Sequence, residues 1–324
     1  FVKSLNRLVI GFLSFLVIGS ISADEPGMAE EAGKQLFRAA ASGDVSQVLQ
    51  AGTSNLTGKA QTLAEGTLLS LFPTAEVEIT WNDEQELEGS LLILAPLLES
   101  ADNTELMFMQ ASASQYDRRT TVNLGLGARH LAMGDKLLMG VNAFYDHEFP
   151  FDHQRVSVGA ELRTTMWEIN ANYYWGTSGW KLGRAGALSQ ERAMDGFDIE
   201  YGMPLPYLPR TKIYGTYFRW SSSPGTKGDN GWQGSLESEI LDGVNLKMGH
   251  RYYSDMNDEV FAAIEVDVVD LMTTNGSDKP FVSNVAWELA SMKEERYAKV
   301  RRENLIRKEK RTVNADFVVT VSGF

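Results

Sequence analysis

The stretch that decides the fold is Arg119–Arg129, which reads RTTVNLGLGAR. Its apolar positions are Val122, Leu124, Leu126 and Ala128, and the positions between them are Asn123, Gly125, Gly127 and Arg129. Successive side chains of a β-strand point to opposite faces. This alternation therefore predicts a strand with one apolar face and one face of polar residues and glycine.

The same alternation recurs along most of the chain. Clear runs occupy residues 76–81, 139–146, 155–163, 167–174, 197–203, 244–251 and 260–267, and less regular runs occupy 89–98, 104–113, 211–220 and 233–240. Together they predict about twelve strands, an even number of the kind that bacterial outer-membrane barrels have.

Two features distinguish these strands from those of a soluble β-sandwich, which also alternate. Aromatic residues stand at the ends of the apolar faces, where a girdle at the lipid headgroups would lie, at Trp81, Tyr145, Trp167 and Tyr173. The opposite faces carry glycines as well as charges, which a solvated face has less reason to hold. The predicted fold is an all-β transmembrane protein, an antiparallel outer-membrane β-barrel over residues 75–270.

The connections between the predicted strands give an independent test. In a barrel that starts from the periplasm, odd-numbered connections lie outside the cell and even-numbered ones lie in the periplasm. The even connections are short, at 99–103, 132–135, 164–166 and 241–243, with 204–210 longer, whereas the two longest, 176–194 and 221–232, are both odd. Short periplasmic turns and long surface loops are typical of such barrels.

The polar faces of these strands are predicted to line the interior of the barrel, the lumen. The lumen-facing candidates are Glu76, Glu78, Asn123, Arg129, Asn142, Arg155, Glu161, Arg163, Glu168, Asn170, Asp198, Glu200, Lys247, Arg251, Glu265 and Asp267.

Composition limits the functions that the chain can have. The formal net charge of −13 argues against general nucleic-acid binding, which needs a basic surface. The absence of cysteine excludes disulfides and thiolate metal sites. No phosphate loop, nucleophile elbow or metal-ligand spacing occurs, so we expect no cofactor, no metal and no enzymatic activity.

Histidines that stand beside aspartates are the candidate catalytic residues of a hydrolase. Asp146-His147 and Asp152-His153 flank a predicted surface loop, and an Asp/His pair can activate water. Adjacent residues on a strand point to opposite faces, so neither dipeptide forms a dyad by itself, and a pairing of Asp146 with His153 is the remaining alternative. His130 and His250 are interpreted as polar residues at strand ends.

The first residues have the pattern of a secretory signal peptide. Lys3 and Arg7 precede the apolar run Leu8–Ile18, and small residues up to Ala23 offer a cleavage site. The run is shorter than the roughly 20 residues that a spanning helix needs. We predict a signal peptide over 1–23 and a helical periplasmic arm over 24–74, because residues 28–37 are rich in helix formers.

The alternation stops after the last predicted strand, and the chain becomes basic. Ser283–Arg311 has near-helical spacing of apolar residues, and its basic positions and their polar neighbours are Arg296, Lys299, Arg301, Arg302, Asn304 and Arg307. This segment could remain in the periplasm as a solvated tail, or it could enter the acidic lumen, where opposite charges attract more strongly than in bulk water. Composition leaves both alternatives open.

Several stretches resemble one known family in collinear order. The resemblance begins at Leu69–Val77 (LSLFPTAEV), is strongest at Arg119–Arg129 and Leu138–Asp146 (LMGVNAFYD), and continues past the barrel at Arg296–Ile306 (RYAKVRRENLI). It returns in between at Gly159–Arg163, Ala171–Tyr174, Gly196–Ile199 and Gly249–Tyr252. These residues resemble the β-domain of the intimin/invasin family, the inverse autotransporters of type V secretion.

In that family a twelve-stranded barrel holds a linker in its lumen, and the linker leads to an exported passenger that serves adhesion or invasion. The resemblance implies that 271–311 is a pore-threading linker, with a linker helix inside the lumen. It also implies a translocator and anchor in the outer membrane of a Gram-negative bacterium. Residues 312–324 are expected to form a short β-like stub without a passenger domain, so the resemblance identifies no host receptor.

A stand-alone, passenger-less barrel that acts as a channel or as a structural protein is the alternative function. The expected partners are outer-membrane lipid and, by resemblance, periplasmic chaperones and the barrel-assembly machinery. We expect a monomer that binds no nucleic acid.

Overall fold

The computed structural model describes residues 72–82, 87–183, 186–221, 229–254, 257–273 and 279–312. The predicted signal peptide, nearly all of the predicted periplasmic arm and the predicted stub after residue 312 lie outside the described residues.

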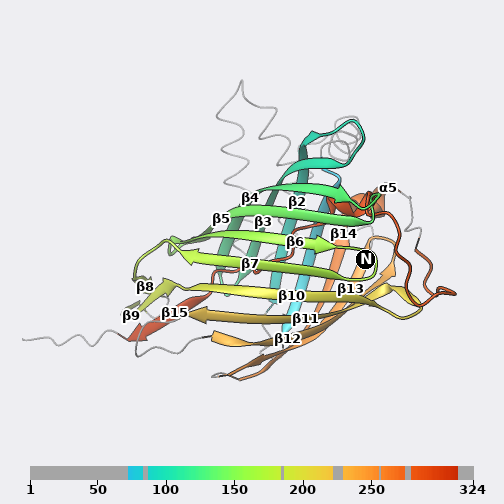
Figure 1. Cartoon of the computed structure of the whole chain (residues 1–324). Helices are drawn as coiled ribbons and strands as arrows, with labels where there is room; N and C mark the ends of the chain where they lie inside the picture. The colour runs from blue at the N-terminus through green and yellow to red at the C-terminus, as the bar shows by residue number, and fades with distance from the viewer. Residues whose placement is uncertain are drawn as a thin grey trace, which may run out of the picture.

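Twelve antiparallel strands close into a barrel (Figure 1), which confirms the predicted fold class. They are β1 (Thr74–Asn82), β2 (Leu87–Glu99), β3 (Glu105–Tyr116), β4 (Arg119–Ala132), β5 (Leu137–Phe149), β6 (His153–Arg163), β7 (Glu168–Gly176), β10 (Asp195–Leu205), β11 (Leu208–Ser221), β12 (Asp229–Leu241), β13 (Val244–Tyr253) and β14 (Glu259–Asp267). Each strand pairs with its sequence neighbour in the wall, and β1 pairs with β14 to close the ring.

The two faces of the strands are divided as the alternation predicts. In β4 the side chain of Asn123 is fully buried, whereas its neighbour Leu124 is 52% exposed. Trp81, Tyr145 and Tyr173 are also among the exposed large side chains. An apolar residue that is exposed on a barrel wall faces lipid, so the buried polar face must line the lumen.

The turns differ in detail from the predicted connections. Asp117 and Arg118 alone join β3 to β4, both with positive φ, as two-residue hairpins require. The connection predicted at 204–210 is also shorter than expected, because β10 and β11 extend to Leu205 and Leu208. The pairing of these two strands shifts between Pro204 and Leu205, and such an irregularity lets a strand tolerate proline.

The two ends of the barrel carry different structures (Figure 1). At one end β8 (Lys181–Gly183) and β9 (Gly186–Ala193), which belong to the long connection between β7 and β10, form a three-stranded sheet with β15 (Lys308–Thr312). At the other end lies the short helix α5 (Val268–Thr273), which directly follows the last wall strand. Val268 of this helix packs against Ala75 and Ile93. Within the described ranges, none of the helices is both long and apolar enough to span a membrane.

The helix predicted over Ser283–Arg311 is the part of the fold prediction that is wrong. The segment holds one short 3-10 helix, η1 (Glu294–Tyr297), and the strand β15, and its remaining described residues have no regular helix. A helix pairs the backbone N–H and C=O groups of a segment with each other, so the segment needs no outside hydrogen-bond partners. Here side chains of the wall accept and donate those hydrogen bonds, so the chain can stay extended.

Candidate functional site

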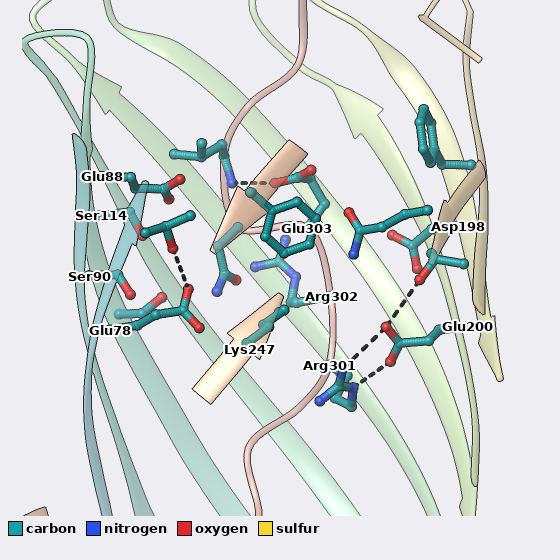
Figure 2. A pocket seen from close by; sticks show the side chains of 18 of the residues that line it. Glu78, Glu88, Ser90, Ser114, Asp198, Glu200, Lys247, Arg301, Arg302 and Glu303 are labelled. Atoms are coloured by element: carbon teal, nitrogen blue, oxygen red, sulfur yellow. Dashed lines mark hydrogen bonds and ion pairs between the residues drawn. The ribbon is translucent and has the colours of Figure 1, made fainter. Parts of the chain in front are cut away.

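We call residues 279–312 the linker. The residues before Met292 lie along the rim of the barrel, where Ser283 and Trp287 form hydrogen bonds at the turn between β10 and β11. The residues after it run through the inside of the barrel to the other end (Figure 1). At the end with short turns, the Met292 backbone N–H donates to the Asp135 carbonyl at 2.7 Å. At the opposite end, Lys308–Thr312 pair with β9. Figure 2 shows the linker between Glu78 and Ser114 on one side and Asp198 and Glu200 on the other.

Side chains of the wall bind the backbone of the linker at many positions. Arg129 Nη1 donates to the carbonyls of residues 296 and 298, both at 2.6 Å. Arg155 donates to the carbonyls of residues 303 and 305 at 2.6 and 3.0 Å. Further donors to linker carbonyls are Arg163 to residue 299, Asn172 to residue 301 and Asn123 to residue 304, at 2.9–3.0 Å. Because carbonyl groups are the same in every residue, these contacts hold an extended chain with little regard to its sequence.

Two wall side chains also accept hydrogen bonds from the linker. The backbone N–H of Val300 donates to Gln110 Oε1, and that of Glu303 donates to Tyr174 Oη, both at 2.8 Å. Backbone donors that are buried without a partner cost free energy, so these acceptors stabilise the extended conformation.

Cationic side chains of the linker form ion pairs with acids on several strands. Lys299 Nζ lies 2.7 Å from Glu76 and also contacts Glu265. Arg301 binds Glu200 and lies 2.8 Å from Glu237 Oε1. Arg302 binds the carboxylate of Asp146 with two nitrogens, at 2.7 and 2.8 Å. The last pair is fully buried, and buried charges are stable only when they are paired in this way.

One apolar side chain of the linker is also held in the lumen. Val300 is 3% exposed and packs with Leu94, Leu106, Phe108 and Phe144. The lumen is therefore polar with apolar patches. The alternation does not predict these patches, because it assigns polar residues to the inward positions and Phe108 and Phe144 are exceptions.

All lumen-facing candidates lie on the inner side of the wall. Asn123, Arg129, Asn142, Arg155, Glu161, Arg163, Glu168, Asn170, Asp198 and Glu200 are buried, and Glu76, Glu78, Lys247, Arg251, Glu265 and Asp267 line internal cavities. Many of them also bind each other, as in the pair of Arg129 Nε with Glu161 Oε1 at 2.5 Å. Such pairs fix the wall donors in place before a chain binds to them.

The linker candidates do not all contact the wall through their side chains. Arg296 lies at the end with short turns, 3.6 Å from Glu99. Asn304 uses its backbone carbonyl. Arg307 pairs with Glu303 of the linker itself at 2.7 Å and also donates to Tyr253 Oη of β13 at 3.5 Å. Lys299, Arg301 and Arg302 are the linker candidates whose side chains pair with acids in the middle of the lumen, whereas Arg296 reaches Glu99 at the end of β2.

Several residues of the site escaped the sequence reasoning. Gln110, Tyr174, Glu237 and Glu148 contact the linker but were not singled out. Asp146 is a catalytic candidate in the sequence analysis, yet it falls on the inward positions of its strand. Its alternation with outward apolar residues was the signal that could have found it.

The structure does not form the cross-loop pair of Asp146 with His153. It brings the other cross-loop Asp/His pair, His147 and Asp152, into contact. Asp146 binds Arg155 and Arg302 in the lumen, whereas His147 Nε2 lies 3.3 Å from Asp152. His153 is fully buried with Nε2 at 3.7 Å from Glu191 Oε2, so the Asp146/His153 pair does not form. Of the other two histidines, His130 contacts Glu105 and His250 lies near Asp258.

A cluster of charges surrounds the place where the linker leaves the barrel. Arg119 Nη1 lies 2.8 Å from both Glu148 Oε1 and Glu191 Oε2, and Lys308 contacts Glu148 as well. Glu191 belongs to β9. Burial alone would raise the pKa of its carboxyl, but the neighbouring His153 and Arg119 bring the pKa down to about 2. The charged form of Glu191 is thus stabilised at this exit.

Space remains on one side of the linker. A cavity of about 230 Å³ is lined by residues such as Glu78, Glu88 and Lys247, and a larger one of about 980 Å³ opens near η1. Residues of β1 and of β11–β14 line both cavities, and none of their described lining residues belongs to β4 or β5. Among the described residues, no group of His, Asp or Glu has the arrangement of a metal site.

Comparisons with known proteins agree with this architecture. The family model described as the inverse autotransporter β-domain matches residues 27–304. A putative attaching and effacing protein homolog of Escherichia coli K12 is 34% identical over 143 residues, which cover 44% of this chain and 48% of that protein. Invasin of Yersinia enterocolitica is 33% identical over 143 residues, which cover 44% of this chain and 17% of invasin.

The aligned part of the chain thus spans about half or less of these curated relatives. A solved structure from work on in-meso crystallization of membrane proteins has a TM-score of 0.61 and 22% identity, covering 74% of this chain and 100% of that one. That likeness concerns the fold alone. The family match favours a barrel without enzymatic activity.

The closed barrel, its inner linker and the family match over most of the chain lead to one conclusion. The protein belongs to the inverse autotransporter β-domain family, of the intimin/invasin type, and is a β-barrel of the Gram-negative outer membrane.

Proposed function

We propose that this barrel exports the chain that follows its linker and anchors it at the cell surface, in the manner of an adhesin or invasin. The observation that carries the proposal is the path of the linker. It crosses the lumen in an extended form and reaches the end that carries the long connections. In outer-membrane barrels, long connections face the exterior.

The contacts inside the lumen support a polypeptide as the exported substrate. Wall donors such as Arg129 and Arg155 bind backbone carbonyls of the linker. A passage that holds a chain by its backbone suits the transit of a long polypeptide, since successive residues present the same carbonyl groups. The names of the relatives, invasin and a putative attaching and effacing protein homolog, favour a surface role for the exported part.

The experiment places an epitope tag after Phe324 in the full chain and tests antibody binding to intact cells. A second chain carries the same tag in the short turn after Asn103, at the end without β15. We expect the first tag to be accessible and the second to need permeabilised cells. If the barrel is folded but the first tag is accessible only after permeabilisation, export by this barrel is wrong.

A stand-alone channel is the second candidate, and the cavities beside the linker favour it. Ion conductance of the full chain in planar bilayers, without exposure of the tag after Phe324, would support it. Negligible conductance together with tag exposure would support export.

The remaining assignments are also proposals. We propose that residues 1–23 are a signal peptide, that 24–74 form a periplasmic arm, and that 271–311 act as the pore-threading linker. We propose a monomer in contact with outer-membrane lipid, assembled with periplasmic chaperones and the barrel-assembly machinery, as the family resemblance implies.

A further inference from the structure

Charged residues face each other directly across six of the twelve interfaces between wall strands, and five of these six follow one rule. Within the described part of the wall, such Asp, Glu, Lys and Arg pairs have opposite signs on every interface but one. They are Asp146 with Arg155, Arg163 with Glu168, Lys212 with Glu237, Glu237 with Lys247, and Arg251 with Glu259.

The exception is the seam, where β1 meets β14 and the barrel closes. There Glu76 faces Asp267, and Glu78 faces Glu265. At two successive inward positions, an acid on one strand therefore lies directly opposite an acid on the other. Like charges directly opposite on paired strands destabilise the pairing, and the effect grows where water is scarce. The charge pattern therefore weakens the one interface that joins the two ends of the barrel sequence.

The described residues of the flanking strands β2 and β13 place no cation directly opposite these acids. On the β2 side, Leu92 faces Glu76 and Ser90 faces Glu78. On the β13 side, Asn245 faces Glu265. The wall cation Lys247 is paired with Ala263 of β14, not with a seam acid; it lies 3.4 Å from Glu237 and attracts Glu78 as well.

The linker supplies a cation at this place. Lys299 Nζ lies 2.7 Å from Glu76 on β1 and contacts Glu265 on β14, so one ammonium group joins both strands of the seam. Two residues earlier, the carbonyl of Tyr297 accepts a hydrogen bond from Thr74 Oγ1 at 2.5 Å, which holds the linker to the start of β1.

We propose that Lys299 of the linker closes the seam between the first and last wall strands. Its charge neutralises carboxylates that would otherwise repel each other across β1 and β14. The closed barrel is then fully stable only when the linker occupies the lumen, which couples barrel closure to linker insertion. The proposal does not require that the chain be exported.

The rival explanation is that Lys299 only ties the linker to the wall. Arg302 provides the comparison, because it binds Asp146 on β5, away from the seam. Glu78 separates the two explanations. It faces Glu265 across the seam and also attracts the cations Lys247 and Lys299. Removing its charge should therefore restore stability after the loss of Lys299 only if repulsion within the seam matters.

The experiment measures heat-modifiable migration of the full chain in detergent for Lys299→Met, Arg302→Met, and each of these combined with Glu78→Gln. We expect Lys299→Met to lower the unfolding midpoint by about 5–10 °C. Adding Glu78→Gln should restore at least half of that loss. The same addition to Arg302→Met should restore nothing, because Arg302 does not neutralise the seam.

The outcome that overturns the proposal is an Lys299→Met midpoint that Glu78→Gln leaves unchanged or lowers further. If Lys299→Met yields no folded barrel, recovery of folded protein in the double variant supports the proposal. Failure of that double variant to fold, where Glu78→Gln alone folds, overturns it. Lys299→Arg, which keeps the charge, should retain most of the stability, and a loss equal to that of Lys299→Met also overturns it.

Discussion

Asp146 and Arg155 form a buried ion pair, with Arg155 Nε 2.8 Å from Asp146 Oδ2, and both residues also bind the linker. Asp146 accepts from the guanidinium of Arg302, while Arg155 donates to linker carbonyls. The pair thus joins two neighbouring strands, β5 and β6, to the chain that passes through the lumen. It shows that the wall and the linker form one connected set of charges.

The first prediction concerns this pair. Asp146→Asn leaves Arg155 and Arg302 buried without their anionic partner, so we expect the barrel to lose about 3–5 kcal/mol of unfolding free energy. Urea unfolding followed by heat-modifiable migration measures the loss. Asp152→Asn is the control, because Asp152 is largely exposed beside His147, and it should change the stability by less than about 1 kcal/mol. Equal stability of the two variants would contradict the prediction.

The second prediction concerns the apolar contact of the linker. Val300→Ala removes two methyl groups from the cluster around Phe108 and Phe144, which should cost roughly 2 kcal/mol of linker binding within the barrel. We expect faster cleavage of the linker by a protease added to the detergent-solubilised protein. Val285→Ala is the matched control, since Val285 is 49% exposed and should leave the cleavage rate unchanged. Unchanged cleavage of Val300→Ala would show that this contact does not hold the linker.

The alternation predicted where the strands lie, which side chains face lipid and which face the lumen, and that the number of wall strands is even. Each of these properties depends on local sequence. A residue such as Leu124 faces lipid whichever strand lies next to its own. The helix predicted for the linker was wrong for the opposite reason. Its backbone partners, Arg129 and Arg155, are far away in sequence, and no local pattern shows that they will supply hydrogen bonds.

The acids of the seam are a similar case. The sequence placed Glu76, Glu78, Glu265 and Asp267 on inward faces, but not opposite each other. Whether they lie opposite each other depends on the register between β1 and β14. No short turn joins these two strands, so no turn fixes that register. Charge alone leaves open whether the basic segment enters the lumen, and the family resemblance favours entry. Only the register assigns Lys299 to the seam.

The third prediction concerns inward glycines. A Cβ at Gly127 would lie 2.2 Å from the ring of Phe108, so the ring must move. We expect Gly127→Ala to cost about 1–3 kcal/mol of unfolding free energy in urea. Gly215→Ala, on the exposed outer face of β11, is the control, because a Cβ there meets no atom within 4 Å. The double variant Gly127→Ala with Phe108→Leu should recover part of the loss, and no recovery would contradict the steric explanation.

The fourth prediction concerns pH at the exit, where β15 pairs with β9. The pKa of Glu191 is lowered to about 2 from the ordinary value of 4.5, because Glu191 interacts with His153 and Arg119 despite its burial. A carboxyl with a depressed pKa contributes stability above its unfolded pKa and loses it as the pH falls through its folded pKa. The exit sheet should therefore weaken between about pH 4.5 and pH 2.

Protease cleavage near Lys308–Thr312, measured with an acid-stable protease across this pH range, checks that expectation. Cleavage of the natural chain should accelerate as the pH falls from about 4.5 to 2. Glu191→Gln cannot lose a charge, so its cleavage should be faster at pH 5 and should change less on acidification. Parallel pH profiles for the two chains would show that Glu191 does not control the exit. In that case the pairing of Glu309 with Arg192, whose closest atoms lie 2.5 Å apart, would be the next contact to test.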